Sequence, residues 1–158
     1  MKIISHRGYL EGPNPDKENN PQAVEECLSY KFDVEIDLRM LKGKFFLGHD
    51  EAIYEIKVEW LYEYNENLWI HCKNKECLEN LNSFHQKLNF FWHENDTFTI
   101  TSKNYIWAYP SKEIFKNAIN VLPEINIEDT KFKKKKNILG ICTDYPKMYS
   151  SLLEDGTL

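Results

Sequence analysis

The segment 33–39 constrains the fold of this chain more than any other stretch of its sequence. It reads Asp-Val-Glu-Ile-Asp-Leu-Arg, so charged and apolar residues alternate strictly. Successive side chains of a β-strand point to opposite faces, and the segment is therefore predicted to be a strand with one ionic and one apolar face. The ionic face holds Asp33, Glu35, Asp37 and Arg39. Taken alone, such a strand would suit the exposed edge of an antiparallel sheet.

The rest of the chain alternates between short β-branched or aromatic runs and helical stretches. Strands are predicted at residues 2–6, 32–39, 68–73, 89–94, 97–101, 105–109, 118–122 and 138–143, and helices at 21–30, 58–64, 76–88, 112–116 and 148–154. This alternation favours an α/β fold with a parallel sheet. We expect a small, trimmed TIM-type (β/α)8 barrel with several short or missing helices, because a full barrel needs roughly 200 to 250 residues.

Composition narrows the class of protein. At 158 residues the chain fits one domain, spanning residues 1–158. The net charge of −5 disfavours binding to nucleic acids or anionic membranes. A His-Arg pair near the start and the absence of a long apolar stretch predict a cytoplasmic protein without stable membrane association. The four cysteines have no CxxC spacing and are expected to be reduced thiols.

Within a parallel barrel, the carboxylates on the ionic face of segment 33–39 would need a compensating partner. Strands of such a barrel are covered on both faces, so clustered carboxylates must be compensated by a cation or become protonated. Glu35 and Asp37 stand near the carboxyl end of their strand and are predicted ligands of one divalent cation.

Two histidines follow neighbouring predicted strands. His6 and Arg7 close the first strand, and Gly8 then permits a tight turn. His49 follows a hairpin-like segment after the second strand. A lone histidine is more often structural, but two imidazoles flanking a cation can divide proton removal and proton donation between them.

Together these residues resemble the glycerophosphodiester phosphodiesterases, within the phosphatidylinositol phospholipase C-like superfamily. Five elements match the family pattern in order and span most of the chain: His6-Arg7-Gly8, Glu18-Asn19, Glu35-Ile36-Asp37, His49-Asp50 and Gly140-Ile141-Cys142-Thr143-Asp144-Tyr145-Pro146. The resemblance implies a phosphoric diester hydrolase that uses a divalent cation and the His6/His49 acid-base pair. The expected substrate is a small, soluble, polyol- or sugar-linked phosphodiester.

The third predicted strand departs from the family pattern. The family has a Glu two residues before a Lys there, whereas this chain has His71 before Lys73. By position, His71 is the third metal ligand, and an imidazole shifts preference from Mg²⁺ or Ca²⁺ toward Zn²⁺ or Mn²⁺. The alternative is a neutral His71 lining a site that binds metal weakly. Lys73 is expected to reach the phosphate or to pair with Asp37.

The remaining roles follow from the resemblance. Arg7 and Lys73 are expected to share the phosphate charge. Trp107 is a candidate for substrate contact because it falls at a predicted strand end. His49 is assigned as base and His6 as acid, with roles that exchange when water opens a cyclic product. Further candidates at predicted strand ends are His93, Glu94, Tyr109 and Glu124.

Two other classes of function stay open at this point. One is a non-catalytic phosphate or sugar-phosphate binding module on a degenerate barrel, suggested by the missing third carboxylate. The other is a protein-interaction subunit, since a trimmed barrel exposes an apolar wall. A homo-oligomer would complete such a barrel.

Overall fold

The computed structural model describes residues 1–110, 113–126 and 137–157. The strands are β1 (Lys2–His6), β2 (Asp33–Leu41), β3 (Lys44–Leu47), β4 (Tyr54–Ile56), β5 (Leu68–Cys72), β6 (Phe90–Phe91), β7 (Phe98–Ile100), β8 (Ile106–Ala108), β9 (Ala118–Val121) and β10 (Gly140–Thr143). The helices are η1 (Pro15–Lys17), α1 (Pro21–Ser29), α2 (Val58–Glu63), α3 (Lys75–Phe84), α4 (Pro123–Asn126) and α6 (Pro146–Glu154).

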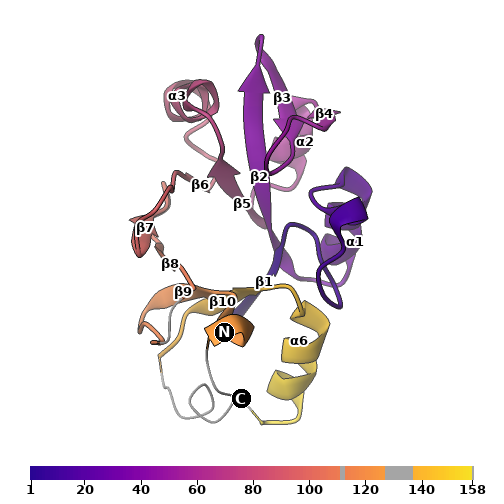
Figure 1. Cartoon of the computed structure of the whole chain (residues 1–158), viewed down its shortest axis with the longest axis vertical. Helices are drawn as coiled ribbons and strands as arrows, with labels where there is room; N and C mark the ends of the chain where they lie inside the picture. The colour runs from indigo at the N-terminus through magenta and orange to yellow at the C-terminus, as the bar shows by residue number, and fades with distance from the viewer. Residues whose placement is uncertain (111–112, 127–136, 158) are drawn as a thin grey trace.

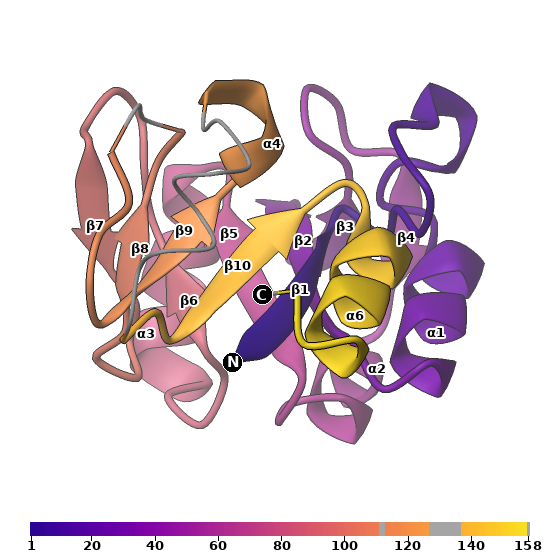
Figure 2. The same cartoon turned by 90° about the horizontal axis from the view of Figure 1, so that it is seen from below.

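These strands form one curled, mixed sheet (Figure 1). Its parallel part runs in the order β6-β5-β2-β1-β10-β9-β8. The first and last strands in sequence are therefore neighbours. Figure 2 shows β10 beside β1, with α6 and α1 on the same side of these strands. These two strands thus lie in the middle of the parallel part of the sheet.

The predicted (β/α)8 barrel is wrong. A strand lies in each of the eight predicted ranges, but β7 pairs antiparallel with β8, and β2, β3 and β4 form an antiparallel extension. Within the described residues no helix lies between β6 and β9. The predicted helix at 112–116 is absent over 113–116, and residue 112 lies outside the described range.

Chain length explains this difference. A parallel crossover needs about a dozen residues or more, usually with a helix. The connections on either side of β7 are much shorter, so the chain turns back on itself there. A hydrogen bond from Thr101 N to Tyr105 O, 2.9 Å long, closes that turn.

The alternation predicted for segment 33–39 is confirmed by strand β2. Val34, Ile36 and Leu38 are fully buried in a core that also contains residues of α1, α2 and α3. The opposite face, called the inner face below, carries Asp33, Glu35 and the other ionic residues of β2. Apolar side chains from six other strands pack on that inner face: Ile4, Trp69, Phe91, Trp107, Ile119, Val121 and Cys142. Both faces of the parallel sheet are therefore covered, as expected for parallel strands.

Two further expectations from the sequence concern the cysteines and the absence of a membrane-spanning segment. All four cysteines are buried and free, which confirms the prediction of reduced thiols. Across the described ranges, none of the helices has the length and apolar character that crossing a bilayer requires.

Candidate active site

Strand register brings the predicted metal ligands together. On the parallel strands β1, β2 and β5, His6 lies opposite Glu35 and Asp37 lies opposite His71. Their side chains share the inner face near the carboxyl ends of these strands. His71 Nδ1 lies 3.1 Å from Asp37 Oδ1 and 3.9 Å from Glu35 Oε1. Glu35, Asp37 and His71 are all buried, with at most 9% of each residue exposed.

The geometry of these three residues fits a divalent cation. One ligand atom from each lies within 4.8 Å of the others. Two ligands that are each about 2.0 to 2.6 Å from one ion lie at most about 5 Å apart, so a single ion can contact all three. Asp37 Oδ1 is buried and lies 3.1 Å from His71 Nδ1, so these two ligand atoms can face the same ion. Elsewhere in the described residues no other such group of His, Cys, Asp and Glu occurs.

Several partners compensate the buried charge of Asp37. Its Oδ2 is 3.1 Å from Arg7 Nε and accepts a 3.0 Å hydrogen bond from Asn19 Nδ2. Lys73 Nζ is 3.8 Å from Oδ1. Burial alone would raise the pKa of Asp37, but the contact with His71 and the charge of Arg7 hold this pKa well below its usual value. Asp37 is therefore ionised at neutral pH.

Glu35 responds to the same surroundings in the opposite way. Its side chain is buried against the inner face, and the nearby charge of Asp37 adds repulsion. Burial and this repulsion raise the pKa of Glu35. A cation would favour the ionised form of Glu35, so metal binding at this site would release a proton when Glu35 is protonated.

The turn after β1 carries Arg7 into the site. Arg7 and Gly8 both have left-handed backbones, with φ of 54° and 81°, and Gly8 supplies the expected conformational freedom. Arg7 N donates to Glu35 O at 3.0 Å, and Asn19 N donates to Arg7 O at 2.9 Å. The guanidinium also donates to Glu18 Oε2 at 3.0 Å. The Glu18-Asn19 pair thus holds Arg7 against Asp37.

His6 is oriented by a carboxylate from the far end of the chain. Its Nδ1 lies 2.7 Å from Asp144 Oδ1, next to the end of β10. A carboxylate only accepts hydrogen bonds, so Nδ1 carries the proton and Nε2 is left for proton transfer. Burial alone would lower the pKa of His6. The hydrogen bond to Asp144 and the charge of Glu35 outweigh burial and raise this pKa.

His49 occupies the loop between β3 and β4, close to β2. Gly48 N donates to Asp37 O at 3.1 Å, and the Arg39 guanidinium donates to His49 O. Only glycine fits at position 48, because a Cβ there would lie 2.0 Å from Glu51 O and φ is 146°. His49 Nδ1 lies 2.8 Å from Asp50 Oδ1. Burial lowers the pKa of His49, and the positive charge of Arg7 lowers it further.

The predicted residues line one cavity of about 170 Å³. It is bounded by His6, Arg7, Glu35, His49, His71, Lys73 and Trp107, together with His93, Glu94, Tyr109 and Val121. Asp37 lies behind this wall, in contact with Arg7 and His71. Trp107 is only 2% exposed, and its ring centroid lies 4.7 Å from that of Phe91. Its side chain therefore mainly packs in the wall of the cavity.

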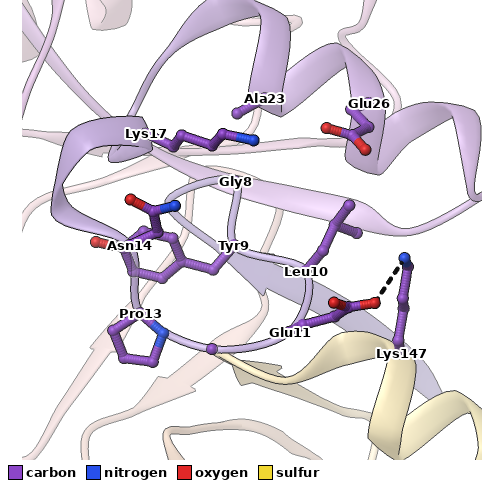
Figure 3. A pocket seen from close by; sticks show the side chains of 11 residues that line it. Gly8, Tyr9, Leu10, Glu11, Pro13, Asn14, Lys17, Ala23, Glu26 and Lys147 are labelled. Atoms are coloured by element: carbon purple, nitrogen blue, oxygen red, sulfur yellow. Dashed lines mark hydrogen bonds and ion pairs between the residues drawn. The ribbon is translucent and has the colours of Figure 1, made fainter.

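A larger cavity, of about 330 Å³, lies beside the loop after β1. Figure 3 shows Lys17 and Glu26 on one side of it and the ion pair between Glu11 and Lys147 on the other. It is lined by no histidine. Tyr9 links it to the site, because its hydroxyl donates to Glu18 Oε2 at 2.9 Å.

Sequence reasoning missed the function of two residues in this site. Asp144 and Asn19 were part of matching motifs, but neither was assigned a partner. The contact of Asp144 follows from the strand order. When β10 lies beside β1, Thr143 pairs with Ser5, and the next residue, Asp144, falls next to His6. Glu124, a predicted strand-end candidate, does not line the cavity and instead contacts Asp144.

No family model, no curated protein and no solved structure matches the chain.

Proposed function

We propose that this protein is a metal-assisted phosphodiesterase. The observation that carries the proposal is one cavity lined by His6 and His49, two imidazoles with opposite pKa shifts, and by Glu35 and His71. Asp37, the third residue of the candidate metal group, lies directly behind its wall. The resemblance to glycerophosphodiester phosphodiesterases supports the reaction class.

The chemistry of Glu35, Asp37 and His71 supports a divalent cation as the cofactor. Two carboxylates and one imidazole form a mixed oxygen and nitrogen set that suits Zn²⁺ or Mn²⁺ better than Mg²⁺ or Ca²⁺. When bound, the cation would act as a Lewis acid toward a phosphoryl oxygen. Arg7 and Lys73 line the cavity beside these ligands and would share the negative charge of the phosphate.

The two histidines divide the proton transfers. With its lowered pKa, His49 is neutral near pH 7 and accepts a proton from a substrate hydroxyl next to the phosphodiester. The hydroxyl oxygen then forms a bond to phosphorus and the bond to the leaving alcohol breaks. The raised pKa of His6 favours its protonated form, which gives its proton to the departing alkoxide. Water opens the cyclic phosphate with the roles exchanged.

Cavity size limits the substrate to a compact group. At about 170 Å³, the cavity is smaller than typical ligand pockets, which measure about 300 to 1,000 Å³. We therefore infer that the cavity holds the phosphate and a small polyol or sugar carrying the attacking hydroxyl, while the leaving alcohol extends outward. Strong, selective binding to phospholipid vesicles would contradict a soluble substrate.

The test measures alcohol release from a panel of soluble phosphodiesters, with added Zn²⁺ or Mn²⁺ and with chelator. His6→Ala and His49→Ala should each lower kcat by about 100-fold or more, since each proton transfer typically contributes about 10²- to 10⁴-fold. His85→Ala is the matched control, because His85 lines a different cavity and pairs with Tyr62. Near-normal turnover in either site variant would refute the mechanism.

A non-catalytic phosphate-binding module is the second candidate. The ion pairs of Asp37 with Arg7, His71 and Lys73 favour it, because they compensate the carboxylate without a cation. This second function would be supported if the protein binds phosphate but hydrolyses no phosphodiester in the panel, with or without metal.

A further inference from the structure

Glu124 contacts the residue that orients His6. One of its oxygens, Oε1, accepts hydrogen bonds from Asp144 N and from Thr143 Oγ1, each 2.9 Å long. Thr143 is fully buried, and its hydroxyl also accepts a 3.0 Å hydrogen bond from Tyr145 N. Glu124 Oε1 thus holds the backbone N–H of Asp144 directly, and it holds the N–H of Tyr145 indirectly, through the Thr143 hydroxyl.

The other oxygen of Glu124 makes this arrangement unusual. Oε2 is buried and has no hydrogen-bond partner. Glu124 is half-buried, and a buried carboxylate oxygen without a hydrogen-bond partner is unfavourable. Burial of Glu124 also raises its pKa. An exposed glutamate would avoid both costs.

The backbone turn before Glu124 determines where its side chain lies. Leu122 follows β9 with φ of 45°, a left-handed conformation that is strained for any residue other than glycine. A 2.7 Å hydrogen bond from Leu122 N to Cys142 O ties the turn to β10. Pro123 then begins α4 and brings Glu124 over the end of β10. The strained turn therefore places Glu124 against Thr143 and Asp144.

We propose that Glu124 is a positioning residue that holds Asp144 in register with His6. This inference rests on the proposed function, because it assigns Glu124 a role in that acid-base pair. Glu124 Oε1 accepts a hydrogen bond from Asp144 N, and Asp144 Oδ1 in turn contacts His6 Nδ1. Without Glu124, the segment after β10 can shift, and the His6 ring loses the partner that fixes its tautomer.

Two variants test the proposal. Glu124→Ala removes both hydrogen bonds, whereas Glu124→Gln keeps an oxygen that can accept them. Partners that orient functional side chains typically contribute about 10- to 100-fold. Glu124→Ala should therefore lower kcat by about tenfold or more with little change in KM, and Glu124→Gln should restore most of it. Glu66→Ala, which removes an exposed carboxylate, is the control.

A second readout does not need activity. The proton shared by His6 Nδ1 and Asp144 gives a separate downfield imidazole signal in proton NMR, assigned by its loss in His6→Ala. This signal should weaken or disappear in Glu124→Ala and persist in Glu124→Gln and Glu66→Ala. If the wild-type chain hydrolyses no phosphodiester but the signal follows this pattern, the proposed function fails while the positioning role stands.

The proposal is overturned if folded Glu124→Ala keeps both the wild-type kcat and the His6 signal. Circular dichroism and a thermal melt establish folding. If Glu124→Ala does not fold, Thr143→Val replaces it, because it removes one of the two bonds to Oε1 at nearly constant volume. Unchanged kcat and signal in Thr143→Val would then overturn the proposal equally.

Discussion

Asp37 is the residue on which the charges of the site converge. It contacts Arg7, His71 and Lys73, and its backbone N–H donates to Asn19 Oδ1 at 2.8 Å. These contacts explain why Asp37 stays ionised although it is fully buried. Its neighbour Glu35 has weaker compensation, including a 3.9 Å contact with His71, and burial together with the charge of Asp37 raises its pKa. The two carboxylates therefore differ in their need for a cation, although both lie on one face of β2.

The two histidines predict a bell-shaped dependence of kcat/KM on pH. Activity should fall as pH drops through the lowered pKa of His49, because the base becomes protonated, and as pH rises through the raised pKa of His6, because the acid loses its proton. Asp144→Asn removes a charge that raises the pKa of His6, so burial should then dominate. We expect the basic limb alone to move to lower pH in this variant.

The measurement is kcat/KM across pH 5 to 9 at saturating metal, for the wild type and Asp144→Asn. Asp50→Asn is the matched control at the other histidine, and its carboxylate is exposed, so its effect on the profile should be small. A basic limb that stays in place in Asp144→Asn would assign that limb to a group other than His6.

At the scale of elements, the β3–β4 loop shows how a turn places a residue of the candidate site, His49. Gly48 is needed because any Cβ would collide with Glu51 O. Gly48→Ala should therefore displace His49, destabilise the fold by about 1 to 3 kcal/mol and lower kcat by at least tenfold. The comparison is Gly43→Ala, at the β2–β3 turn, where φ is 74° and nothing lies within 4 Å of the added Cβ.

Denaturant unfolding and steady-state kinetics on both variants separate the two effects. Gly43→Ala carries the backbone cost of a left-handed alanine, about 1 to 2 kcal/mol, but should keep the wild-type kcat. If both variants lose kcat equally, loss of activity would follow from lower stability rather than from the position of His49.

Helices and strands could be predicted from the sequence where a local pattern of residues determines them. The alternation of segment 33–39 identified β2, its buried face and its ionic face, and His6 and His71 fell on the neighbouring strands beside it. The direction of β7 was not predictable in this way, because alternation is the same in parallel and antiparallel strands. Direction depends on the length of the connection, and the short turn after Ile100 reverses the chain.

At the scale of the whole molecule, the barrel prediction failed because it treated every strand as part of a repeated β/α unit. The antiparallel pairs β2–β3 and β7–β8 break that repeat. The site nevertheless depends on one feature that both architectures share, the placement of β10 beside β1, which brings Asp144 to His6. Such a contact joins residues 138 positions apart, and no local pattern in the sequence encodes it.

Metal binding should stabilise the whole molecule, whether or not it hydrolyses phosphodiesters. A ligand at 100 times its Kd stabilises the folded state by about 2.7 kcal/mol, and 1 kcal/mol corresponds to about 2 to 4 °C in Tm for a chain of this size. Zn²⁺ or Mn²⁺ at that excess should therefore raise Tm by about 5 to 10 °C, and chelator should reverse the shift. Asp37→Asn should abolish the shift, whereas Asp16→Asn, at an exposed carboxylate, should keep it. An equal shift in both variants would place the bound metal away from Glu35, Asp37 and His71.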